Sequence, residues 1–191
     1  MLSFGSPLAA HMAIHIATMN VVAPVFTCLL RHYSGISPKV GRPPWLGAAT
    51  GLQLAALWLW HAPVTMQFAM STASGLLLMQ SSLMLSALWF WHCVFGTARW
   101  RAILALLITA KLFCLLGVLL VFAPRAIYPI PHAMEQHHVP FAAAIADQQL
   151  AGLLMLIACP LTYLVAGVAT TTRWVFTVEA GPAATNRLDA R

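Results

Sequence analysis

Five long apolar runs, each able to cross a lipid bilayer, limit the fold of this chain more than any other feature. They cover residues 8–30, 45–69, 74–96, 101–123 and 148–171. A transmembrane helix needs about 20 predominantly apolar residues. The runs are continuous and do not alternate with polar residues, so they indicate helices and argue against barrel strands. We therefore predict an all-α, polytopic transmembrane bundle with about five spans.

Composition points to a single membrane domain. The 191 residues are 61% hydrophobic and 7% charged, whereas soluble domains carry about 25% charged residues. Connections between the runs are short except at 31–44 and 124–147, which leaves no room for a soluble domain. We expect residues 1–191 to form one domain. The first run has no basic segment before it, so we interpret it as a mature helix and not as a secretory signal.

Basic residues are unevenly distributed between the connections, and this predicts the orientation. Most lie in the first loop, the third loop and the C-terminal tail, at Arg31, Lys39, Arg42, Arg99, Arg101, Arg173, Arg187 and Arg191. The positive-inside rule places such segments in the cytoplasm, so we expect the N-terminus outside and the C-terminus inside. The net charge of +6 is then mainly a topology signal, and we expect no nucleic-acid partner.

Three histidines fall inside the spans near the predicted outer face. His11 and His15 are four residues apart and share one helix face, while His61 lies in the second run. At a rise of about 1.5 Å per residue, they lie about 5, 10 and 12 Å below the outer surface. Ionisable groups within a bilayer are functional candidates by default. The alternative is that these imidazoles bond only to carbonyl groups or to interfacial water.

Sulfur ligands occur at the same depth, with Met84 about 15 Å and Met155 about 10 Å below the surface. Imidazole together with thioether suits copper, and methionine favours Cu(I). We therefore predict a copper site formed by His11, His15, His61, Met155 and Met84.

The outer loop 124–147 and its end supply further candidates. Its metal-binding side chains are His132, Met134, Glu135, His137 and His138. These residues are accessory ligands or simply solvated surface, and the sequence leaves both interpretations open. Asp147 marks the mouth of the fifth run. We expect its carboxylate to orient a ligand by a hydrogen bond, with N-capping of its own helix as the alternative.

Other polar groups inside the runs have simpler interpretations. Lys111 is the one permanent charge well inside a span, so it should face the bundle interior or snorkel to an interface. His32 and His92 fall near the cytoplasmic side and are predicted to be interfacial. Pro63 removes the hydrogen bond to the carbonyl of Leu59 and bends its helix. Pro24 and Pro160 should loosen the first and fifth helices near Asn20 and Leu156. Single cysteines at 28, 93, 114 and 159 give no disulfide framework.

Three segments together resemble a known family. They are His11-Met12-Ala13-Ile14-His15 followed by Ala23-Pro24, then Trp60-His61-Ala62-Pro63, and finally Ala146-Asp147-Gln148-Gln149-Leu150-Ala151-Gly152-Leu153-Leu154-Met155. They are similar to the CtaG family of membrane-embedded cytochrome c oxidase assembly factors, which are associated with copper delivery. The resemblance implies that His11, His15, His61, Asp147 and Met155 are the family's characteristic positions. Family members tend to carry further histidines at the start of the third helix, where this chain offers only Met79, Gln80 or Met84.

The leading hypothesis is therefore a non-enzymatic copper-handling assembly factor in the bacterial cytoplasmic membrane. Its copper site would lie toward the periplasm, and its partners would be oxidase subunits or copper chaperones. One alternative is a haem-binding protein with histidines from facing helices as axial ligands. Another is a structural membrane subunit that binds no metal.

Overall fold

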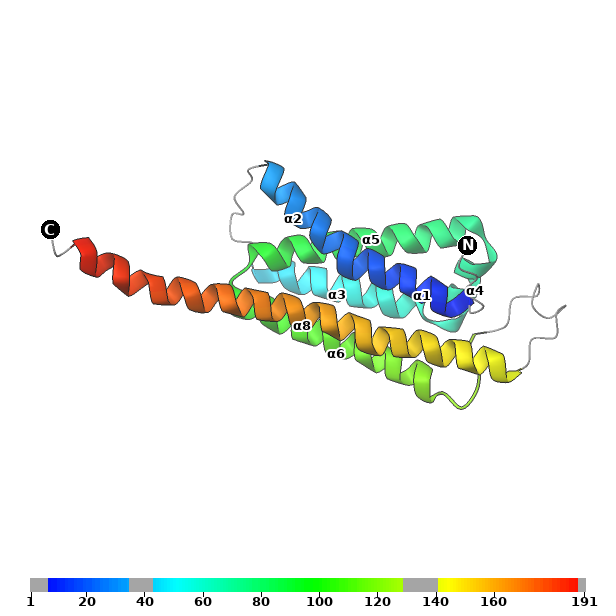
Figure 1. Ribbon diagram of the computed structural model, residues 1–191. Helices are drawn as coiled ribbons and strands as arrows, with labels where there is room; N and C mark the ends of the chain where they lie inside the picture. Colours follow the sequence, from blue (N-terminus) through cyan, green and yellow to red (C-terminus); the bar gives the residue numbers. More distant parts are fainter. Residues whose placement is uncertain (1–6, 35–42, 129–140, 189–191) are drawn as a thin grey trace.

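The computed structural model describes residues 7–34, 43–128 and 141–188, and the secondary structure in these ranges is helical (Figure 1). The chain begins with α1 (Pro7–Ala17), a π-helical segment η1 (Thr18–Val22) and α2 (Ala23–Ser34). The remaining elements are α3 (Pro43–Trp60), α4 (Pro63–Ser71), α5 (Ala73–Gly96), α6 (Arg99–Phe122) and α8 (Phe141–Leu188). The prediction of an all-α chain is confirmed.

Four helical stretches of the described chain are long and apolar enough to cross a membrane. They are Leu8–Tyr33, Ala73–Gly96, Arg99–Phe122 and Ala142–Thr172. They correspond to the first, third, fourth and fifth predicted spans. The membrane class of the fold is thus confirmed, with four continuous candidate spans in the described residues where about five were predicted.

The second predicted span, 45–69, is wrong as a continuous helix, because it is divided into α3 and α4. Ala62 between them is extended, with φ −67° and ψ 140°. The cause is Pro63, which has no N–H to donate and disfavours helical geometry at the preceding residue. Leu59 is the residue whose carbonyl was predicted to lose its partner, and that carbonyl accepts a hydrogen bond from the Thr65 hydroxyl.

The bend in the first helix has a related origin. The backbone N–H of Ala23 bonds to the carbonyl of Thr18, five residues back, and η1 buries Met19 and Asn20. Pro24 follows directly and cannot donate to the carbonyl of Asn20, so the turn widens into a π-bulge. The predicted loosening near Asn20 is confirmed.

The fifth helix is longer than predicted, since α8 extends past 148–171 at both ends and continues through Pro160. Its first residues, Phe141 to Ala146, include four alanines, which are the strongest helix formers. The part of the predicted loop 124–147 that follows residue 140 is therefore helical.

Close packing of α6 on α8 forms the largest helix pair (Figure 1). A Cβ atom added to Gly152 would lie 2.9 Å from the carbonyl oxygen of Gly117, so the two backbones nearly touch. Small residues allow such approaches between membrane helices. α1 packs on α8 and α3 packs on α5. The side chain of Met12 in α1 also contacts that of His61, just after the end of α3.

Basic residues gather at one end of the bundle. Arg31 lies in the last turn of α2, and its guanidinium donates to the carbonyl oxygen of His92 near the end of α5 at 3.2 Å. Arg99 and Arg101 begin α6 at the same end, opposite the N-terminus (Figure 1). The side chains of His32 and His92 are exposed there, apart from the other described histidines, as predicted.

Lys111 does not point into the bundle, so of the two predicted interpretations the one that placed it in the interior is wrong. α6 buries one face of small and apolar residues, including Ala102, Thr109 and Phe113, while the Lys111 side chain is exposed. Residues on a helix are offset by about 100° each, so Lys111 falls roughly opposite Thr109.

Candidate metal centre

Three imidazoles converge where α1 meets the end of α3. The ring centroids of His11 and His15 are 4.2 Å apart, and those of His15 and His61 are 6.1 Å apart. All three side chains are buried, with 7%, 3% and 5% exposure respectively. The helical spacing of His11 and His15 produces the pair, and the break before Pro63 lets His61 face it.

Hydrogen bonds at Nδ1 set the tautomers of two of these rings. His61 Nδ1 donates to the carbonyl oxygen of Leu57 at 2.7 Å, and His15 Nδ1 donates to Oε1 of Gln80 at 3.2 Å. A neutral imidazole that donates from Nδ1 carries its lone pair on Nε2. His15 Nε2 then accepts from His11 Nε2–H at 2.8 Å. Bonds of this kind also orient metal-binding histidines.

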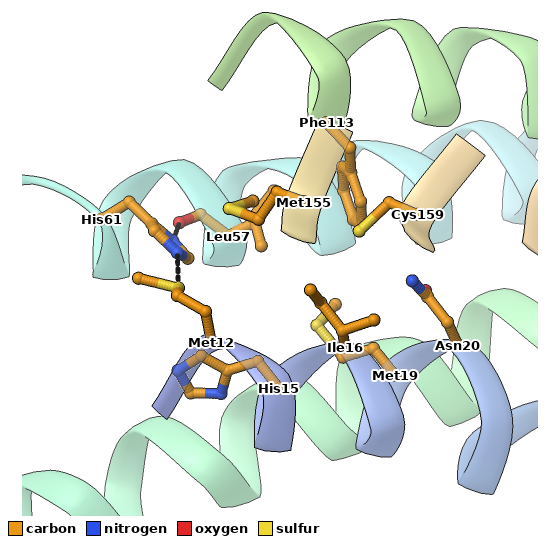
Figure 2. Close-up of a pocket in the computed structure, with 10 residues that line it drawn as sticks. All are labelled: Met12, His15, Ile16, Met19, Asn20, Leu57, His61, Phe113, Met155 and Cys159. Carbon is orange, nitrogen blue, oxygen red and sulfur yellow. Dashed lines mark hydrogen bonds between the residues drawn. The ribbon is translucent and has the colours of Figure 1, made fainter. Parts of the chain in front are cut away.

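The free nitrogen of His61 faces a thioether. Its Nε2 lies 3.2 Å from Sδ of Met12 (Figure 2). In the tautomer set by Leu57 neither atom carries a proton, so two lone pairs point at each other. A soft cation is the kind of group that such a nitrogen–sulfur pair accepts.

A small cavity of about 10 Å³ adjoins this pair. That volume is near the minimum for one water-sized occupant. It lies between α1, η1, α3, α6 and α8 and is lined by Met12, His15, Ile16, Met19, Asn20, Leu57, His61, Phe113, Met155 and Cys159 (Figure 2). The imidazoles of His15 and His61 lie at one end of the cavity, and Asn20 and Cys159 lie at the other. Within the described ranges no three His, Cys, Asp or Glu side chains are placed to hold one metal ion. A metal ion held here would need a further kind of ligand, and the cavity offers methionine sulfur.

Asn20 is the least satisfied polar group in the cavity. The residue is 2% exposed, and neither polar atom of its amide makes a regular hydrogen bond among the described residues, although the weakly polar thiol of Cys159 is close enough to interact with it. Buried polar groups are nearly always bonded, and an exception calls for an explanation. The sequence analysis placed Asn20 only at a loosened turn and did not identify it as a site residue. No sequence motif around Asn20 would have identified it as a site residue.

Asp147 is bonded to the start of α1. Its two carboxylate oxygens accept from the backbone N–H groups of Leu8 and Ala9, each at 2.9 Å. The predicted cap of its own helix is wrong, because α8 begins earlier, at Phe141. The predicted bond to an imidazole is not among its contacts in the described chain. Instead the carboxylate caps the first turn of the helix that carries His11.

The predicted sulfur ligands have different positions. Met155 lines the cavity, whereas Met84 is half-buried against the core and is not one of the lining residues. Met12 lines the cavity but was not predicted as a ligand. The accessory candidates His132, Met134, Glu135, His137 and His138 lie outside the described residues.

The segment after α6 closes over the break between α3 and α4. The hydroxyl of Tyr128 donates to the carbonyl oxygen of His61 at 3.0 Å, and burial raises the pKa of Tyr128 to about 12. The segment is held in turn by Gln148, whose Oε1 accepts from Ile127 N–H at 2.7 Å. Its Nε2 donates to the carbonyl of Leu120 at 3.1 Å. This network fixes the backbone that presents His61.

The fold and the site together define a class, namely a polytopic helical membrane protein with a buried histidine–methionine cavity at the end away from its basic residues. Residues 40–176 match the family model described as cytochrome c oxidase caa3 assembly factor (Caa3_CtaG), and the chain belongs to this family. The predicted resemblance is confirmed. His61, Asp147 and Met155 lie within the matched segment, and His11 and His15 precede it. No curated protein and no solved structure matches the chain.

Proposed function

We propose that this protein binds a copper ion as cargo and aids its delivery during cytochrome c oxidase assembly. The observation that carries the proposal is the pair of unprotonated atoms, Nε2 of His61 and Sδ of Met12, facing each other at 3.2 Å. The family assignment indicates a role in cytochrome c oxidase assembly. The nitrogen and sulfur donor atoms favour copper as the metal. Handing over an ion requires no bond-making chemistry, so the proposed role is not enzymatic.

The donor set favours Cu(I). His61 offers a free imidazole nitrogen, and His15 offers one when its hydrogen bond from His11 opens, while Met12 and Met155 line the same cavity with thioether sulfur. His11 can join once its hydrogen bond to His15 opens. Soft thioethers select Cu(I) over harder divalent ions. A cavity of about 10 Å³ also suits a single ion better than a porphyrin, which favours copper over the haem alternative.

Neutral ligands suit a carrier that must release its ion. Imidazole and thioether bring no negative charge to compensate a buried cation, and burying uncompensated charge is unfavourable. We therefore expect moderate affinity and rapid exchange. The proposed setting is the bacterial cytoplasmic membrane with the site toward the periplasm, because the basic end of the bundle lies opposite. Oxidase subunits or copper chaperones are the proposed partners.

The test is an anaerobic Cu(I) titration of the purified protein against a chromophoric chelator. We expect His61→Ala and Met12→Leu each to raise the Kd for Cu(I) by about tenfold or more, which corresponds to a loss of about 1.4 kcal/mol of binding free energy. Matched controls are His92→Ala and Met70→Leu, whose side chains are exposed outside the cavity. X-ray absorption of the loaded protein should show mixed nitrogen and sulfur ligands.

Oxidase activity in membranes of cells that carry these variants checks the cellular role. It should fall with His61→Ala and Met12→Leu and recover with added copper. A protein that takes up no Cu(I), or whose two site variants bind it as tightly as the controls, contradicts the proposal and favours the structural, metal-free alternative. A Soret band in the purified protein would instead support haem binding.

A further inference from the structure

Lys111 occupies an unusual position for a charged residue. It lies near the middle of α6, about 18 Å along the helix from Arg99 and about 16 Å from Phe122. Its side chain is exposed, and the described residues give it no hydrogen bond or ion pair. The same face of α6 carries Leu104, Leu107, Ile108 and Leu115, which are 42–53% exposed.

Plain lipid is a poor environment for this face. A lysine charge at the centre of a bilayer costs about 3 kcal/mol or more. Snorkelling relieves such a cost near the ends of a span, but the lysine stem reaches only about 6 Å. Half of the hydrocarbon thickness is about 15 Å, so the Lys111 ammonium group at mid-span stays within the apolar layer.

A hollow next to Lys111 can receive side chains from a neighbouring helix. α6 and α8 frame a space of about 300 Å³, and Leu107, one turn before Lys111, forms part of its wall. Gly167 and Thr171 of α8 line it four residues apart, and nothing lies within 4 Å of a Cβ atom built on Gly167. Small residues at this spacing let a neighbouring membrane helix approach closely.

We propose that the α6–α8 face around Lys111 docks a transmembrane helix of another protein, and that this helix carries a carboxylate at mid-membrane depth. Charge complementarity argues for the occupant, because the ammonium group needs an acceptor there. A second copy of this chain lacks one. Its acidic residues are Glu135, Asp147, Glu179 and Asp189. Asp147 caps α1, and the other three lie outside the candidate spans.

This docking face is independent of the copper proposal, because the cavity around His61 lies elsewhere in the bundle and includes neither Lys111 nor Leu107. The test uses the full chain in membranes of its native host. A photo-crosslinking amino acid replaces Leu107 or Leu115 on the face, or Leu85 on α5 as the control, which is 66% exposed. We expect positions 107 and 115, but not 85, to crosslink to a different polypeptide.

Charge variants decide whether Lys111 drives the contact. Lys111→Leu and Lys111→Glu should lower the crosslink yield at least fivefold, while Lys111→Arg should retain most of it. Mass spectrometry should place the adduct on a transmembrane helix with Asp or Glu near its centre. Lys111→Leu removes a charge from an apolar surface, so its thermal stability in detergent should match or exceed that of the parent. Adducts only with lipid or with a second copy, or a yield unaffected by Lys111→Leu, overturn the proposal.

Discussion

Single hydrogen bonds decide which atoms of the buried histidines are available for binding. The carbonyl oxygen of Leu57 accepts a hydrogen bond from Nδ1–H of His61, so the unprotonated Nε2 is directed at Met12. Gln80 has the same effect on His15. Leu57 lines the cavity and Gln80 lies outside it. Both acceptors determine its chemistry, because a neutral imidazole offers only one lone pair.

Tyr128→Phe should destabilise the backbone at His61. The change removes the hydroxyl that donates to this carbonyl, and we expect the free energy of unfolding to fall by about 1 kcal/mol. Burial raises the pKa of Tyr128 to about 12, above the ordinary value of about 10 for tyrosine. Its contribution is therefore complete below pH 10 and is lost as pH rises from 10 to 12.

Denaturant unfolding in detergent micelles at pH 8 and pH 11 measures both effects. The Phe variant should be the less stable protein at pH 8 and should lose less stability than the parent on going to pH 11. Tyr33→Phe, at a residue that is 82% exposed, is the matched control and should change little. Equal pH responses of parent and Tyr128→Phe would contradict the assigned role.

Asp147→Asn should loosen the start of α1. The carboxylate accepts two backbone N–H bonds there, and a negative charge at a helix N-terminus also interacts favourably with the helix dipole. We expect a loss of about 1 kcal/mol. Hydrogen exchange should accelerate at the first amides of α1 and stay unchanged in α5. Gln149→Ala on the same turn is the control, and unchanged exchange in α1 would show that the cap is unimportant.

Residue-level prediction succeeded where spacing alone decides the geometry. His11 and His15 form a pair because residues four apart share a helix face. The same reasoning failed for Asp147, whose partners Leu8 and Ala9 are about 140 positions away in sequence. It also missed Asn20, because burial without a partner is a property of the assembled bundle.

At the scale of elements, two prolines shape the cavity in different ways. Pro63 ends α3 and begins α4, so that the chain turns just after His61. Pro24 produces a π-bulge that rotates Met19 and Asn20 into the core. The positions of both bends follow from the missing proline N–H. Whether a bend breaks the helix or only widens it depends on the packing around it.

Gly152→Ala tests the close crossing of α6 and α8. The new methyl group would lie 2.9 Å from the carbonyl oxygen of Gly117 and from Cβ of Leu120, so the helices must separate. Overpacking of this kind costs about 1–3 kcal/mol. Gly51→Ala is the control, because nothing lies within 4 Å of its Cβ position, and it should be neutral or stabilising. Thermal unfolding in detergent compares the two, and equal melting temperatures would contradict the tight crossing.

The depth of a side chain along its helix was easier to predict than the side of the helix on which it lies. Met84 and Met155 were assigned to one layer from the helical rise, but Met155 alone lines the cavity. A helix places its side chains around a full circle at each level. Rotation about the helix axis is set by the neighbours, and the apolar residues here surround the helices too evenly to reveal it.

At the scale of the whole molecule, the basic end and the histidine end lie opposite each other (Figure 1). We expect a C-terminal green fluorescent protein fusion to fluoresce and a C-terminal alkaline phosphatase fusion to be inactive, because the positive-inside rule predicts that the basic end faces the cytoplasm. A phosphatase fusion after residue 128 should be active. The reverse pattern would place the cavity on the cytoplasmic side and contradict the proposed periplasmic site.

The sequence by itself determined the helical membrane class, the basic end, the bends at proline and the pairing of His11 with His15. Each depends on composition or on contacts within a few residues, where helical geometry is known in advance. Only the tertiary structure decided that His61 meets this pair, that Met12 and Met155 face the cavity, and that Lys111 points outward. Those outcomes depend on how each helix is rotated against its neighbours. Packing sets that rotation, because side chains distant in sequence must fit together.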